Sequence, residues 1–198
     1  MAQRISSFFV AKKIIKEEEK KIYDYCMEVL LASVINFLAM FGIAVFIQMT
    51  LLALCFMVGF AVIRITAGGF HANTHIKCFG IMISIYVVVL IILRKIPEKE
   101  ILFFTTICSI CSSIVILILS PVENKNRLID REDSLKFKRQ SVIRTISLLA
   151  LAYFVSFSFK CYREGFSMVI GISVASLSLI AGTIKNKYEG KEGRIWIW

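Results

Sequence analysis

Residues 29–63 form a run of 35 residues without one charged side chain. As a single straight helix this run would be about 52 Å long, whereas the hydrocarbon core of a bilayer is about 30 Å thick. The run must therefore break, and Gln48, Met49 and Thr50 provide the only polar place for a turn. This pattern predicts an integral membrane protein with one spanning helix on each side of that turn.

The rest of the chain continues the same pattern. Its 198 residues are 58% hydrophobic and 19% charged, and their mean hydropathy is +0.76. Soluble domains average about 45–50% apolar and about 25% charged residues. We therefore predict an all-α polytopic membrane protein with about six transmembrane helices, and five spans or a half-helix are the alternatives. The expected spans are residues 29–47, 51–67, 79–93, 101–120, 145–159 and 166–184.

The positions of Lys and Arg predict how these spans are oriented. Nineteen of the 24 basic residues lie in the N-terminal segment, the C-terminal segment and the two loops that share their side of the membrane. Because cytoplasmic loops carry an excess of Lys and Arg, both termini and these two loops are expected in the cytoplasm. The net charge of +10 then indicates contact with anionic inner-leaflet lipid rather than with nucleic acid.

This topology divides the chain into three parts. Residues 1–28 mix apolar side chains with lysines, which is typical of an amphipathic helix that lies in the cytoplasmic membrane interface. Residues 29–184 are the six-span membrane domain, with an inner loop at 64–78 and a basic inner loop at 121–144. Residues 185–198 form a cytoplasmic tail.

The inner loop at 64–78 reads R-I-T-A-G-G-F-H-A-N-T-H-I-K-C and combines groups that are costly at a membrane boundary. It contains both histidines of the chain and one cysteine, Cys78. A thiol beside an imidazole or a cation can act as a thiolate near neutral pH. The other five cysteines lie in or beside apolar runs, where a free cysteine behaves as a small hydrophobic residue. They are Cys26, Cys55, Cys108, Cys111 and Cys161.

Spacing alone leaves three interpretations of this loop. On one straight helix, His71 and Cys78 would be about 10.5 Å apart along the axis, too far for a hydrogen bond. His75 could meet Cys78 across one turn, so spacing favours His75 as the base unless Gly68 and Gly69 break the helix. His71, His75 and Cys78 could instead bind a metal ion. The third interpretation is a polar loop without chemistry.

A more specific pattern is formed by Arg64, Gly68, Gly69, His71 and Cys78, which read R-x3-G-G-x-H-x6-C. In its membrane context this pattern resembles the accessory gene regulator B family of bacterial membrane endopeptidases. A second match follows the fourth expected span, where the chain reads S-P-V-E-N-K-N-R over residues 120–127. The length of the chain, its six spans and its basic N-terminal segment are also similar to that family.

The resemblance implies a cysteine endopeptidase of the bacterial cell membrane that processes the precursor of an autoinducing, quorum-sensing peptide. Cys78 would be the nucleophile and His71 its catalytic partner. Removal of the precursor's C-terminal tail would leave a peptide that closes into a thiolactone-type ring. Expected supporting residues are Gly68, Gly69, Asn73 and Thr74, and expected substrate-binding residues are Arg64, Lys125, Asn126 and Arg127.

No cofactor and no metal are expected for this activity. The expected partners are the peptide precursor, anionic inner-leaflet lipid and a second copy of the chain in a homodimer. Two alternatives remain open. One is a small peptide exporter or channel without covalent catalysis, and the other is a metal-binding membrane protein that uses His71, His75 and Cys78.

Overall fold

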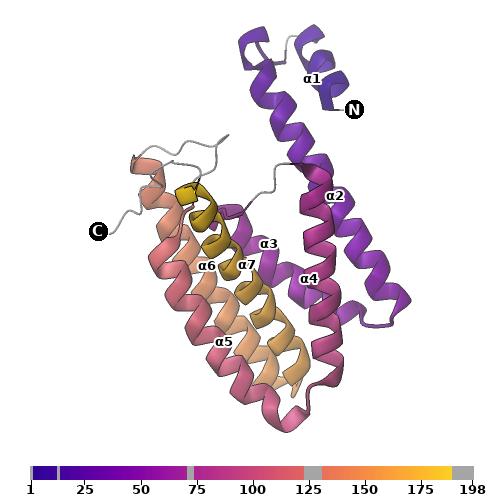
Figure 1. Ribbon diagram of the computed structural model, residues 1–198, viewed down its shortest axis with the longest axis vertical. Coiled ribbons are helices and arrows are strands. Elements are labelled where there is room, and N and C mark those ends of the chain that lie inside the picture. The colour runs from indigo at the N-terminus through magenta and orange to yellow at the C-terminus, as the bar shows by residue number, and fades with distance from the viewer. Residues whose placement is uncertain (1, 13, 71–73, 123–130, 189–198) are drawn as a thin grey trace.

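The computed structural model describes residues 2–12, 14–70, 74–122 and 131–188 of the chain, and these residues are helical almost throughout (Figure 1). Within them there is no β-strand, so the all-α prediction is confirmed. The elements are α1 (Ala2–Ala11), the short 3₁₀ helix η1 (Glu17–Glu19), α2 (Lys20–Phe46), α3 (Thr50–Ala67), α4 (His75–Lys95), α5 (Glu98–Leu119), α6 (Arg131–Ser158) and α7 (Tyr162–Tyr188).

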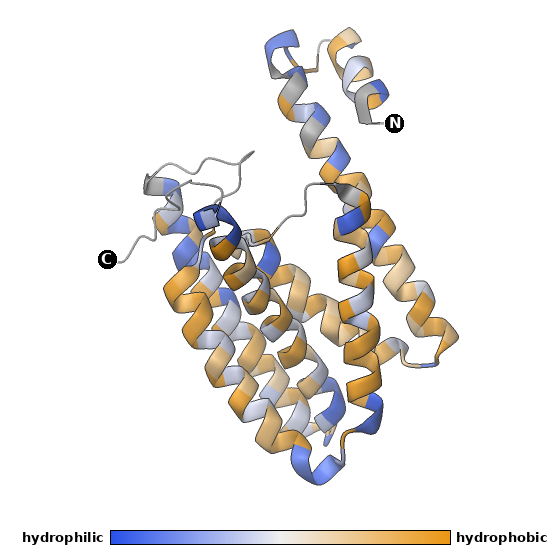
Figure 2. Ribbon diagram, in the orientation of Figure 1, coloured by the Kyte–Doolittle hydropathy of each residue, from blue (hydrophilic) through white to orange (hydrophobic). Residues whose placement is uncertain are grey.

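Six of these helices, α2 to α7, are long and apolar enough to cross a membrane, which confirms the predicted number of spans. Hydrophobic residues cover most of their length, whereas hydrophilic residues gather at the two ends of the bundle (Figure 2). This distribution matches a slab of hydrocarbon between two aqueous phases, because charged side chains are costly inside the bilayer.

The charge-free run breaks at the expected place. Helix α2 ends at Phe46, and α3 begins at Thr50. Between them Gln48 adopts a left-handed conformation, with φ of 59°, and the amide of Met49 donates to the carbonyl of Ala44 at 2.9 Å. The amides of Ile47, Gln48 and Met49 thus donate to carbonyls of the last turn of α2, as backbone near hydrocarbon requires.

Two helices begin earlier than the positions of the charged residues predict. Helix α2 begins at Lys20 and its apolar window at Ile22, well before the expected start of the first span at 29. Helix α6 begins at Arg131, so part of the segment expected as the basic loop 121–144 is helical. The physical reason is the same in both places. A helix keeps its backbone hydrogen bonds in water as well as in lipid, so it continues past the last apolar residue.

The first helix lies beside the start of α2 rather than in the six-helix bundle (Figure 1). The hydroxyl of Ser6 on α1 donates a hydrogen bond to the carboxylate of Asp24 on α2. The Phe8 side chain is exposed on α1, and Lys12 lies 5.9 Å from its ring centroid. Of the N-terminal segment expected as an amphipathic helix, Ala2–Ala11 are helical, whereas Ile15 lies in the bend that follows; the contact of the segment with lipid stays a prediction.

Helix α7 is the centre of the bundle and packs against α3, α5 and α6. It approaches α3 closely because both helices have glycine at their contact. A Cβ atom on Gly59 would overlap the carbonyl oxygen of Met168, and one on Gly171 would overlap the carbonyl oxygen of Phe56. Small residues at helix contacts are the usual way in which membrane helices gain van der Waals packing. This close packing holds α7 in place, so residues that bind to its ends are attached to a fixed helix.

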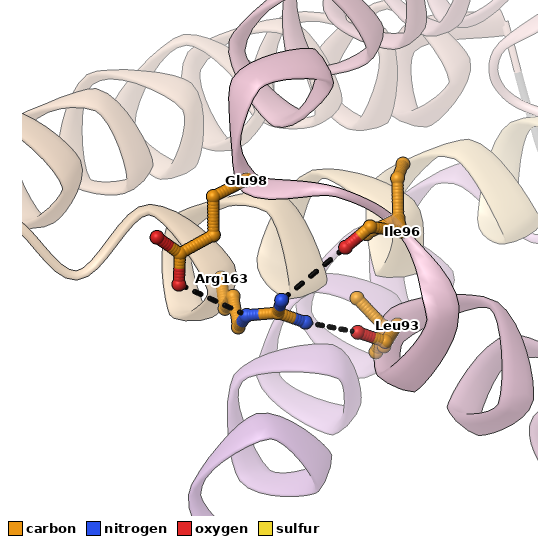
Figure 3. Close-up of polar contacts among 4 residues, drawn as sticks. All are labelled: Leu93, Ile96, Glu98 and Arg163. Atoms are coloured by element: carbon orange, nitrogen blue, oxygen red, sulfur yellow. Dashed lines mark hydrogen bonds and ion pairs between the residues drawn. The ribbon is translucent and has the colours of Figure 1, made fainter.

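The connection between α4 and α5 is fixed to the first turn of α7 by one arginine (Figure 3). The guanidinium of Arg163 donates to the carbonyls of Leu93 at 2.7 Å and Ile96 at 3.2 Å. It also lies 3.6 Å from the carboxylate of Glu98. These carbonyls belong to the end of α4, where the helix leaves its last acceptors unpaired. We call this end of the bundle the far end, because the candidate site lies at the other one.

Candidate functional site

The site end of the bundle is organised by Arg64, in the last turn of α3. Its Nη1 donates to the carbonyl of Gly68 at 3.0 Å and to the hydroxyl of Ser178, on α7, at 2.7 Å. Its Nη2 donates to the carbonyl of Phe70. Arg64 thus binds the chain that leaves its own helix and ties it to α7. The planar guanidinium suits this role because it offers several donors in a fixed fork.

Gly68 and Gly69 allow the chain to turn sharply against this guanidinium. Gly68 ends α3 with φ of 74°, and Gly69 has φ of 123°, a region that side chains strongly disfavour. A Cβ atom on Gly68 would lie 2.5 Å from the carbonyl oxygen of Val122, and one on Gly69 would overlap Nη1 of Arg64. The break at these glycines, which a pairing of His71 with Cys78 would require, is therefore found, and both positions require glycine.

The turn is also held from two other parts of the chain. The amide of Val122 donates to the carbonyl of Ala67 at 2.9 Å, and Val122 forms an isolated parallel bridge with Gly68. On the opposite side, the amide of Phe70 donates to the carbonyl of Ser178 at 2.8 Å. We refer to Arg64, Gly68, Phe70, Val122 and Ser178 together as the Arg64 junction. It joins three segments that are far apart in the sequence.

Cys78 lies in the first turn of α4, and its side chain is partly exposed. Thr74 caps this helix in an extended conformation, and its hydroxyl accepts a hydrogen bond from the amide of Lys77 at 3.3 Å. Cys78 therefore lies at the N-terminus of α4, and a helix N-terminus is one of the surroundings in which protein thiols act as nucleophiles.

The structure brings together several of the predicted site residues. Arg64, Gly68 and Gly69 meet in one junction, and Cys78 lies in the first turn of α4, the next helix along the chain. Because α4 begins at His75, with Thr74 as its extended cap, His71 and Cys78 do not lie on one continuous helix. The remaining predicted residues lie outside the described part of the chain. These are His71, Asn73, Lys125, Asn126 and Arg127, and of His75 only the backbone, at the start of α4, is described.

Ser178 and Val122 contribute to the site although they were not among the predicted site residues. Val122 follows Pro121, whose peptide bond with Ser120 is cis, and it belongs to the second stretch that carries the family resemblance. That resemblance was the available signal for Val122. Ser178 is one of several serines in the last span, and nothing in its local sequence marks it as a contact of Arg64.

Comparisons with known proteins match one family over most of the chain. The family model described as Accessory gene regulator B matches residues 2–181. A relative from Clostridium perfringens, named as AgrB-like, is 25% identical over 170 residues, which cover 83% of this chain and 78% of the relative. Another of the same name, from Listeria innocua serovar 6a, is 23% identical over 80% of this chain and 78% of its own length. No solved structure was found to match. Because the family model spans nearly the whole chain, this protein belongs to the accessory gene regulator B family.

Proposed function

We propose that this protein is a membrane cysteine endopeptidase that removes the C-terminal tail of an autoinducing peptide precursor. The family to which the chain belongs is an enzyme family of quorum-sensing peptide processing. The observation that supports the proposal best is the anchored turn at Gly68–Phe70. This turn is held by Arg64 and directly precedes His71, and Cys78 follows in the first turn of the next helix, α4.

The proposed chemistry begins at the Cys78 sulfur. His71 accepts the thiol proton, and the thiolate attacks the carbonyl carbon of the scissile peptide bond. The carbon–nitrogen bond then breaks, and His71 donates the proton to the leaving amine. The precursor's N-terminal part remains on Cys78 as a thioester. A thiol within the precursor then attacks this thioester, which releases Cys78 and closes a thiolactone, whereas attack by water gives the linear acid.

The tetrahedral intermediate of each step needs donors for its oxyanion. The amides of Gly68 and Phe70 are already used, because they donate to the carbonyls of Arg64 and Ser178. At the start of α4 the amides of Lys77 and Cys78 donate to Thr74, whereas those of His75 and Ile76 precede the first hydrogen-bonded turn of the helix. We therefore propose that the start of α4, which carries Cys78 itself, supplies the oxyanion hole. This differs from an oxyanion hole built on the two glycines.

The proposed substrate site extends from the junction into the basic segment that follows Val122. Since the amide of Val122 is bonded to Ala67, the chain that continues toward Lys125 and Arg127 starts beside the anchored turn. We propose that these two residues, with Asn126, bind an acidic tail of the precursor. We propose that both termini and the candidate site face the cytoplasm. The basic N-terminal segment would then lie on anionic inner-leaflet lipid, and a second copy of the chain is the proposed protein partner.

The proposal is tested with purified protein in lipid nanodiscs and a synthetic precursor peptide that has an internal cysteine and an acidic C-terminal tail. Intact mass spectrometry should show the N-terminal part of the peptide added to the wild-type protein. The adduct should be absent from Cys78→Ala and form slowly in His71→Ala, and a chelator should not change it. Processing by Cys78→Ala would contradict a cysteine endopeptidase. Loss of activity with chelator would instead favour a metal site, and transport without cleavage would favour an exporter.

A further inference from the structure

We propose that Ser178 is a positioning residue of the candidate active site, which acts through Arg64 and does not touch the substrate. The inference rests on the proposed function, because it assigns a residue to the reaction of Cys78. Ser178 lies on α7, whereas Cys78 lies on α4 and Arg64 on α3. Through these contacts the central helix of the bundle would control a reaction at its end.

The hydroxyl of Ser178 is oriented to accept a hydrogen bond from Arg64. A serine hydroxyl has one proton to donate and lone pairs with which it accepts. The proton of Ser178 is used by the carbonyl of Ala175, at 2.7 Å within α7. The lone pairs are then left for Nη1 of Arg64, which lies 2.7 Å from the oxygen. Hydrogen bonds to charged groups are about twice as strong as neutral ones, so this contact restrains the guanidinium firmly.

This contact fixes the guanidinium to a different helix. The other two described acceptors of Arg64 are the carbonyls of Gly68 and Phe70, which belong to the same turn that Arg64 holds in place. With these two contacts alone, the Arg64 side chain and the turn could move together relative to α7. Ser178 ties the pair to α7, and its carbonyl independently holds the amide of Phe70 at 2.8 Å. One residue therefore holds the turn twice, once directly and once through Arg64.

The surface of α7 next to Ser178 is shaped for this turn. One helical turn further along α7, Gly182 has no side chain, and residues 69 and 70 occupy the space that a side chain would fill. A Cβ atom on Gly182 would lie 2.8 Å from the amide nitrogen of Phe70 and 2.9 Å from the carbonyl carbon of Gly69. The segment from Ser178 to Gly182 is thus a seat for residues 69 and 70. The next residue in the chain is His71, the proposed base.

A change at Ser178 should therefore alter turnover more than substrate binding. Ser178→Ala removes the acceptor for Arg64 and keeps the backbone carbonyl for Phe70. We expect kcat for precursor cleavage to fall on the order of tenfold, with KM within about twofold of wild type, because small displacements of catalytic groups cost rate. Ser178→Thr keeps the hydroxyl and should restore most of kcat. The matched control is Ser176→Ala, whose hydroxyl donates only within α7, to Ser173 at 2.7 Å.

A double-mutant cycle separates positioning through Arg64 from a general structural effect. If Ser178 acts through the guanidinium, then Ser178→Ala should lower kcat little further in protein that already carries Arg64→Lys. Additive losses of kcat would overturn the inference, and so would wild-type kcat in Ser178→Ala. A rise of KM at constant kcat would also overturn it, since that result would assign Ser178 to substrate binding.

Hydrogen–deuterium exchange gives a second readout that does not depend on Cys78 chemistry. The peptide that contains the Phe70 amide should exchange faster in Ser178→Ala than in wild type or Ser176→Ala. Unchanged exchange in Ser178→Ala would contradict the role in holding the turn. Cys78→Ala, measured in parallel, distinguishes the two proposals. If it still cleaves the precursor, the proposed function fails, and if it is inactive while Ser178→Ala cleaves at the wild-type rate, only this inference fails.

Discussion

Nη1 of Arg64 lies 2.7 Å from the hydroxyl oxygen of Ser178, although 114 residues separate them in the chain. Arg64 stands at the end of α3 and Ser178 in α7, so the contact closes one end of the bundle. The glycine turn that leads to His71 passes between these two helices and is bonded to both residues. The position of the proposed catalytic base thus depends on how α3 and α7 pack.

Arg64→Lys tests whether the geometry of the guanidinium matters or only its charge. Lysine keeps the charge but offers one ammonium in place of a planar fork. It cannot reach the carbonyls of Gly68 and Phe70 and the hydroxyl of Ser178 together. We expect kcat for cleavage of the precursor to fall by about tenfold to a hundredfold, with KM little changed. Steady-state kinetics in nanodiscs measure both values.

The control for this variant is Arg94→Lys, which changes an exposed arginine in the last turn of α4 at the far end. It should leave kcat and KM as in wild type. If Arg64→Lys cleaves the precursor as fast as wild type, charge alone is sufficient and the junction has no positioning role. If instead KM rises while kcat stays constant, Arg64 binds the substrate directly.

Gly182→Ala should weaken processing although it favours the helix. Alanine in a helix interior is about 1 kcal/mol more favourable than glycine. At this position, however, the new Cβ would lie 2.8 Å from the Phe70 amide nitrogen, so the turn must move away from α7. We expect loss of precursor cleavage on the order of tenfold, measured with the same assay. The thermal unfolding midpoint should change much less than the activity.

Gly42→Ala is the matched control, because a Cβ atom on Gly42, in α2, would meet nothing within 4 Å. This variant has the same gain in helix propensity without a displaced turn. Its activity should equal that of wild type. Equal activity of Gly182→Ala and Gly42→Ala would show that the turn does not need its seat on α7.

The sequence was sufficient to predict the spans because charge is excluded from the bilayer interior. The need for a break within residues 29–63 followed from their length, and its place followed from the polar residues 48–50. A break at Gly68 and Gly69 was a condition for pairing His71 with Cys78, and the structure shows it. Helix ends could not be predicted in this way. Asp24 and Glu28 end the apolar pattern, but they do not end α2, which starts at Lys20.

Ser178 could not have been found from the sequence. Serines 173, 176 and 178 each donate a hydrogen bond to a carbonyl three or four residues earlier in α7, so their local environments are alike. Only the packing of α7 against α3 distinguishes the one that meets Arg64. A long-range contact between side chains depends on helix rotation and tilt, which hydropathy does not determine.

Arg163→Ala should destabilise the fold without changing the chemistry at the site end. The substitution leaves the carbonyls of Leu93 and Ile96 without their charged donor (Figure 3). The ion pair with Glu98 adds little, because that carboxylate is 77% exposed. We expect a loss of about 1–3 kcal/mol in the free energy of unfolding, seen as a lower thermal midpoint. The rate of precursor cleavage per folded molecule should not change.

Glu98→Gln is the control that removes only the ion pair, and its thermal midpoint should be close to that of wild type. If Glu98→Gln is as unstable as Arg163→Ala, the ion pair, not the two carbonyl contacts, holds the connection between α4 and α5. A fall in the rate of Arg163→Ala would show that the two ends of the bundle are coupled.

Joint neutralisation by Lys125→Gln and Arg127→Gln tests the proposed docking of an acidic precursor tail. Removing two positive charges should raise KM for the precursor most at low salt. The reason is that the screening length is about 30 Å at 0.01 M and about 8 Å at 0.15 M. Lys95→Gln with Lys99→Gln removes the same charge at the far end and should leave KM near the wild-type value. A rise of KM that is equal at every ionic strength would contradict electrostatic docking and indicate a direct, short-range contact instead.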